Sequence, residues 1–141
     1  MRIWMGWMLA AALAASAETP REMNGRALEL YRQGRYAEAE TLYEEAMAVD
    51  PDEPVAATNL GVILAERGQP ARALDVWRPA FERHPDASEL GVDLAVAMCQ
   101  TGDWKDAEQT VRTVLAHNPD FEPGRQVGAA LARGPLACRT D

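Results

Sequence analysis

The sequence predicts an all-α protein, a solenoid of three tandem helix–turn–helix units followed by a closing helix. Three observations predict this class. Glycine recurs every 34 residues, at Gly34, Gly68 and Gly102. Proline recurs with the same step, and apolar residues at helical spacing lie on both sides of each glycine. The prolines are Pro51, Pro85 and Pro119.

Each unit is expected to hold two helices. The glycine ends the first helix because it adopts a left-handed backbone without a Cβ penalty. The proline ends the second helix because the residue before it is pushed out of the helical region. The predicted units span 20–53, 54–87 and 88–121, and a capping helix at 122–133 leads into a flexible tail at 134–141.

Large aromatic residues recur within the second helices and are expected in the core rather than in a ligand cage. They are Tyr36, Tyr43, Trp77 and Trp104. Pro79 falls inside the second helix of the second unit, where it removes the hydrogen bond to Asp75. A kink is therefore expected at Pro79.

Composition narrows the function classes. The 141 residues carry 14 Lys and Arg against 22 Asp and Glu, a formal charge of −8. An acidic chain repels phosphate backbones, so nucleic-acid binding is disfavoured. Two cysteines exclude a disulfide-dense scaffold and a four-cysteine zinc site.

The N-terminal 17 residues have the pattern of a secretory signal peptide. Arg2 precedes an uncharged run over 3–15, and Ala15, Ser16 and Ala17 form an A-x-A cleavage pattern. The alternative is an uncleaved anchor, but 13 apolar residues span only about 20 Å against a hydrocarbon core of about 30 Å. Because nearly all basic residues are Arg and Ala is abundant, we expect a bacterial protein. Together with the signal peptide, this predicts a periplasmic or secreted protein with no stable membrane insertion after cleavage.

The repeating residues resemble the tetratricopeptide repeat family. The first unit carries Ala27, Gly34, Tyr36, Ala39, Tyr43, Ala46 and Pro51. The second carries Leu60, Gly61, Gly68, Ala73, Trp77, Ala80 and Pro85. The third carries Leu94, Ala95, Gly102, Trp104, Ala107, Val111, Val114 and Pro119. The resemblance covers residues 20–121 and implies a right-handed α-solenoid that binds proteins.

In that family the first helices of the units line a concave groove. The resemblance places Asn24, Leu28, Tyr31, Arg32, Thr58, Val62, Ala65, Glu66, Val92, Val96, Cys99 and Gln100 there. The mostly apolar lining suits an amphipathic helix or an extended apolar segment. Leu28, Val92 and Val96 stand where some relatives use basic or amide groups to hold a carboxylate, so binding of a chaperone tail is disfavoured. The alternatives are coverage by the chain's own C-terminal segment and contact with a second copy.

No catalytic motif, phosphate loop or cofactor signature is present, and His84 and His117 are expected at helix ends. The chain is therefore predicted not to be an enzyme, and no cofactor or metal is expected. Cys99 and Cys138 could form a disulfide in an oxidising compartment or remain two thiols. The sequence predicts a non-enzymatic protein-binding module of the bacterial cell envelope. The competing interpretations are an accessory of a pilus, secretion or outer-membrane complex that acts through its convex or end faces, and an envelope enzyme.

Overall fold

The computed structural model describes residues 18–134, which form seven α-helices and no strand. The helices are α1 (Pro20–Arg32), α2 (Tyr36–Val49), α3 (Pro54–Glu66), α4 (Pro70–Arg83), α5 (Ser88–Thr101), α6 (Trp104–His117) and α7 (Glu122–Leu131). The predicted all-α fold class is confirmed. The predicted signal peptide, most of the predicted tail and Cys138 lie outside the described residues.

The repeated glycines close the first helix of each unit. Gly34, Gly68 and Gly102 have φ angles of 76°, 74° and 98°, the left-handed region that favours glycine. The amide of the next residue then turns back onto the helix. Arg35 N–H donates to the Leu30 carbonyl at 2.9 Å, and the corresponding bonds recur in the other two units. These bonds satisfy carbonyls at the helix end that would otherwise lack partners.

The start of the first helix is set by a reciprocal cap. Thr19 Oγ1 accepts from the Glu22 amide at 3.3 Å, and Glu22 Oε2 accepts from the Thr19 amide at 2.8 Å. The Thr19 amide, and after it the Thr19 hydroxyl, which also donates to Glu22 Oε2 at 2.8 Å, lower the pKa of the Glu22 carboxyl. Pro20 occupies the first turn, where its missing N–H costs nothing.

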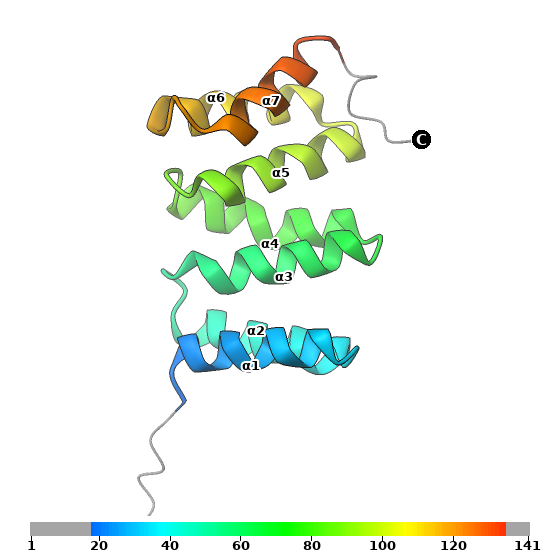
Figure 1. Cartoon of the computed structure of the whole chain (residues 1–141), viewed down its shortest axis with the longest axis vertical. Coiled ribbons are helices and arrows are strands. Elements are labelled where there is room, and N and C mark those ends of the chain that lie inside the picture. The colour runs from blue at the N-terminus through cyan, green and yellow to red at the C-terminus, as the bar shows by residue number, and fades with distance from the viewer. Residues whose placement is uncertain (1–17, 135–141) are drawn as a thin grey trace, which may run out of the picture.

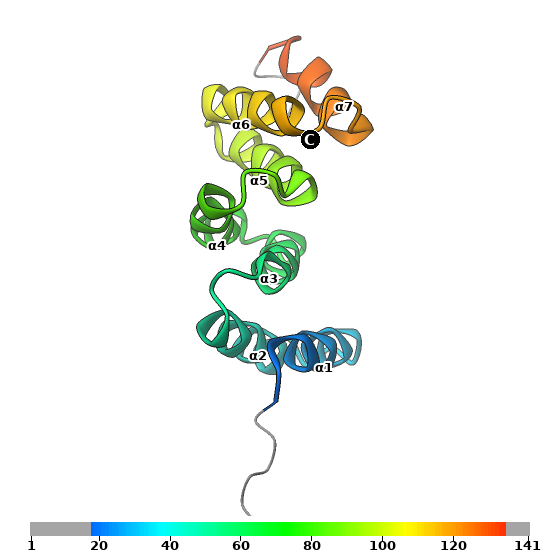
Figure 2. The ribbon, with the colours of Figure 1, turned by 90° about the vertical axis from the view of Figure 1, so that its left-hand side faces the viewer.

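The helices form two layers. Figure 2 shows α1, α3 and α7 on one side and α2, α4 and α6 on the other, with α5 between α3 and α7. Contacts pair α1 with α2, α3 with α4 and α5 with α6, and α1, α3, α5 and α7 contact one another in sequence. The units stack in chain order along the long axis of the molecule (Figure 1). This is the solenoid that the repeat predicts.

Small residues allow close helix packing in the core. Ala27, Ala39, Ala73, Ala95 and Ala107 are fully buried. Tyr43 and Trp77 fill the space beside them, and the indole N–H of Trp77 donates to the Thr58 carbonyl at 3.2 Å.

None of the helices in the described part of the chain combines the length and the apolar character that a membrane span needs.

Two local features differ from, or extend, the expectations. Tyr36 is 40% exposed, so its predicted core position is wrong. Its ring lies 5.3 Å from that of Tyr31, and the Arg67 guanidinium lies 4.9 Å from its centroid. It thus joins the first unit to the second at the surface. The helix α4 continues through Pro79 and ends at Arg83.

Candidate binding face

The layer of α1, α3 and α5 carries two cavities, and we call the surface that contains them the inner face. The first cavity, of about 450 Å³, lies between α1 and α3. The second, of about 280 Å³, lies between α3 and α5, and Trp77 of α4 also lines it. Both cavities occur where the first helices of successive units lie next to each other.

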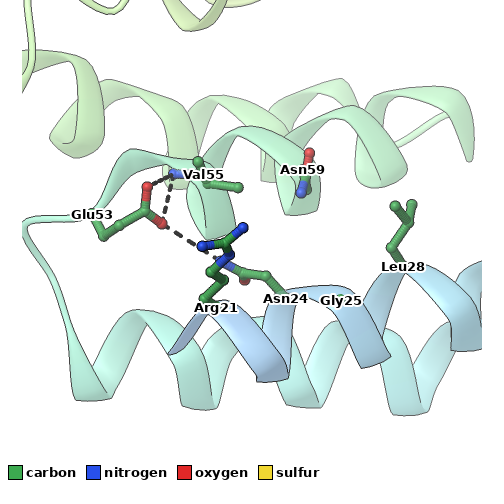
Figure 3. Close-up of a pocket in the computed structure, with 7 residues that line it drawn as sticks. All are labelled: Arg21, Asn24, Gly25, Leu28, Glu53, Val55 and Asn59. Atoms are coloured by element: carbon green, nitrogen blue, oxygen red, sulfur yellow. Dashed lines mark hydrogen bonds between the residues drawn. The ribbon is translucent and has the colours of Figure 1, made fainter. Parts of the chain in front are cut away.

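The α1/α3 cavity is built around one buried amide (Figure 3). Asn24 is only 8% exposed, and its Nδ2 group donates to Glu53 Oε2 at 3.5 Å. Glu53 is held in turn by the Val55 amide at 3.1 Å, at the start of α3. The buried Asn24 Oδ1 atom has no hydrogen-bond partner among the described residues. Leu28 forms part of the apolar wall of this cavity.

The α3/α5 cavity combines apolar walls with carboxylates. Val62, Ala65, Val96 and Ala97 supply the walls, and Glu66, Asp93 and Gln100 supply the polar groups. Burial, followed by repulsion from Glu89, raises the pKa of the Asp93 carboxyl. Glu66 accepts a hydrogen bond from the Tyr31 hydroxyl, and this bond raises the pKa of Tyr31.

Exposed large apolar side chains gather on this face. Leu28, Val55 and Val96 are 36%, 47% and 38% exposed, and all three line the two cavities. Tyr36 and Val49 are the other large hydrophobic residues with comparable exposure in the described part of the chain. The inner face therefore holds most of the exposed apolar groups that water solvates poorly.

Seven residues that the sequence assigned to the groove line these cavities: Asn24 and Leu28 in the first, and Val62, Ala65, Glu66, Val96 and Gln100 in the second. Tyr31, Arg32, Thr58, Val92 and Cys99 line neither. Thr58 donates its hydroxyl to the Pro54 carbonyl of its own helix at 2.8 Å. Arg32 is exposed beside Glu29, with 4.0 Å between the charged groups.

Val92 and Cys99 are buried, at 9% and 4% exposure, within the hydrophobic core. They lie seven residues apart and therefore on one face of α5. The helix α7 packs against α5 at the position where the first helix of another unit would stand.

Sequence reasoning missed Arg21, Val55, Asn59 and Asp93, which line the cavities. Each lies three residues before a position that the sequence did assign, namely Asn24, Thr58, Val62 and Val96. Residues three apart are neighbours on a helix surface. That spacing was the available indication, and the missed residues include Asp93, a charged residue of α5 that lines the α3/α5 cavity.

The predicted Cys99–Cys138 disulfide remains a prediction, because Cys138 lies outside the described residues. Within residues 18–134 no three His, Cys, Asp or Glu side chains are grouped so that they could hold a metal ion. The two cavities of the inner face offer apolar walls, the amide of Asn24 and the carboxylates of Glu66 and Asp93.

Comparison with solved structures places this architecture among known proteins. The chain is similar to the first tetratricopeptide domain of Spaghetti (RPAP3) bound to the HSP90 peptide SRMEEVD, with a TM-score of 0.72 and 18% identity over 82% of this chain and 91% of that one. The second tetratricopeptide domain of human RPAP3, in complex with the HSP70 peptide SGPTIEEVD, gives a TM-score of 0.70 and 17% identity over 82% and 99% of the two chains.

A bacterial structure is similar as well. A tetratricopeptide repeat protein from Parabacteroides merdae gives a TM-score of 0.76 and 20% identity over 86% of this chain, which spans about half (47%) of that one. A search of curated protein sequences finds no match.

Two family models described as "Tetratricopeptide repeat" match this sequence, one over residues 24–77 and the other over residues 64–133. Together they run from α1 to the end of α7, through all three glycine turns and both cavities. The stacked helix pairs, the repeated glycine turns and these matches agree, and the chain belongs to the tetratricopeptide repeat family.

Proposed function

We propose that this chain is a non-enzymatic interaction module that binds a segment of a partner protein along its inner face. One observation carries the proposal: exposed apolar side chains gather at two cavities between successive first helices. A folded stack already holds such a surface in place before the partner binds. Little conformational entropy is therefore lost on association.

The solved relatives support the kind of ligand but not its sequence. Two structurally similar domains hold peptides that end in EEVD, which carry several carboxylates. The inner face of this chain instead carries apolar Leu28 and Val96 and the carboxylate of Asp93. Like charges on the two partners raise the free energy of the complex. We therefore expect a partner segment that differs from these acidic tails.

We further propose that the protein acts in the bacterial cell envelope after removal of residues 1–17. The proposal rests on the A-x-A pattern that ends at Ala17. It is supported by contacts just after that point. Glu18 pairs with Arg26 of α1, and Thr19 caps α1, so the residues that follow Ala17 belong to the first unit.

The binding proposal is tested by selecting random dodecapeptides from a phage-displayed library on the immobilised full chain. We expect the chain to enrich a family of related peptides. The double variant Leu28→Glu, Val96→Glu places charge in both cavities and should lose this enrichment. The variant Val49→Glu is the matched control, because Val49 is 58% exposed and lines neither cavity.

Far-UV circular dichroism of all variants checks that they keep their helices. Equal enrichment of the same peptides by the double variant and by the unmodified chain would remove the inner face as the binding site. No enrichment by the unmodified chain would contradict peptide binding itself.

A further inference from the structure

We propose that the α3/α5 cavity takes a cationic side chain, Lys or Arg, of the bound segment, and that Asp93 is its counter-ion. This inference rests on the function proposed above and specifies the chemistry of the ligand. It starts from the geometry of one cavity and from the charge that the fold leaves unpaired within it.

Asp93 is the carboxylate that α5 contributes to this cavity. It is half-buried, and no hydrogen bond or ion pair from the rest of residues 18–134 reaches it. The other acidic group of the cavity, Glu66, already accepts a hydrogen bond from the Tyr31 hydroxyl. Asp93 is thus a carboxylate without a counter-ion in a partly desolvated position.

This arrangement does not help the fold. Removing a carboxylate from water costs free energy unless a partner compensates, and Glu89 on the same helix adds repulsion. The pKa of Asp93 is raised for these two reasons. A neutral residue would serve the folded state better. A cation that arrives with the ligand would supply the missing compensation.

The shape of the cavity fits the same kind of side chain. Lys and Arg have an apolar stem and a charged end, and they bury the stem along apolar surface. The walls formed by Val62, Ala65 and Val96 would contact the stem. Asp93 would meet the charged end, and Gln100 lines the same cavity with a further acceptor. The volume of about 280 Å³ leaves room for one such side chain.

The test uses the peptide selection described above, with two further variants. Asp93→Asn removes the charge and keeps the size of the side chain. Asp75→Asn makes the same change on α4, at an exposed carboxylate outside both cavities, and is the matched control. We expect the unmodified chain and the Asp75→Asn variant to select peptides with Lys or Arg at one fixed position. The Asp93→Asn variant should lose that preference.

A binding cycle then separates recognition from structure. One selected peptide is compared with its copy in which norleucine replaces the basic residue. The replacement should weaken binding by about tenfold or more in the unmodified chain, as expected for a hydrogen bond to a charged group, and by less than about twofold in Asp93→Asn. In urea unfolding, Asp93→Asn should be no less stable than the unmodified chain. If Asp93 had a structural role, the variant would be less stable.

Three outcomes overturn the inference. Enriched peptides without a fixed basic position would contradict it while leaving peptide binding on the inner face intact. The same basic preference in Asp93→Asn would assign the cation to another acid. Absence of any enrichment overturns both this inference and the proposed function.

Discussion

Gly61 sets the approach of α3 to α4. A Cβ atom built on Gly61 would lie 2.1 Å from the indole Nε1 of Trp77, far inside van der Waals contact. Trp77 is 2% exposed and donates its indole N–H to the Thr58 carbonyl, so the ring cannot move aside without losing contacts. The hydrogen atom of glycine is what this packing requires.

Replacing Gly61 with Ala should therefore destabilise the protein. Overpacking costs about 1–3 kcal/mol, and the better helix propensity of Ala returns about 1 kcal/mol of this. We expect a net loss of up to about 2 kcal/mol in the free energy of unfolding, measured by urea denaturation. Gly25→Ala in α1 is the control, because no atom lies within 4 Å of its added Cβ, and it should stabilise. A Gly61→Ala variant as stable as Gly25→Ala would contradict this account.

Single residues also show where sequence reasoning stops. The resemblance to the repeat family placed Val62, Val92 and Val96 on the inner face, and Val62 and Val96 line the α3/α5 cavity. A place on that face does not give depth, because burial depends on what packs beyond the helix. Val92 was placed there too and is buried. Tyr36 was expected in the core and lies at the first turn of α2, where Arg67 of the next unit covers only part of its ring.

At the scale of an element, the helix α4 contains a proline in its interior, where proline is unfavourable. The helix runs from Pro70 to Arg83 with Pro79 inside it. Proline has no N–H to donate to the carbonyl four residues earlier, and its ring crowds that carbonyl. The two prolines of α4 therefore differ in cost, because Pro70 stands at the first position, where no donor is needed.

Replacing Pro79 with Ala should stabilise the protein, since the new amide can donate to the Asp75 carbonyl. Restoring that bond is worth about 3 kcal/mol, and the greater freedom of the unfolded chain takes back about 1 kcal/mol. We expect a gain of about 2 kcal/mol in the free energy of unfolding, which thermal and urea denaturation would measure. Pro70→Ala should instead lose about 0.5 kcal/mol. A loss of stability in Pro79→Ala would mean that the helix needs the shape that proline imposes.

The sequence repeat by itself was almost sufficient to predict the helices. A glycine and a proline in fixed register interrupt the helical pattern at the same places in every unit, so helix number and order follow from the sequence alone. The cavities did not follow, because each forms between residues of different units. Asp93 and Val62 lie on separate helices, and only the stacked structure brings them to one cavity.

For the whole molecule, each unit is expected to be stabilised by its contacts with the neighbouring units. In a solenoid each unit contacts only adjacent units, and the last one needs a closing element. The helix α7 is that element, and it packs against α5 and α6. Its residue Leu131 is 4% exposed and belongs to the hydrophobic core. The cap therefore stabilises the third unit directly and the first unit only through the others.

Replacing Leu131 with Ala tests this transmission. Loss of a buried leucine side chain costs about 2–4 kcal/mol where the site cannot collapse. We expect amide hydrogen exchange to accelerate most in α5 and α6, and least in α1 and α2, because the latter do not contact α7. Gln126→Ala changes an exposed residue of the same helix and should leave the exchange pattern nearly unchanged. Uniform acceleration along the whole chain would show that the array unfolds as one cooperative block, in which the cap stabilises every unit equally.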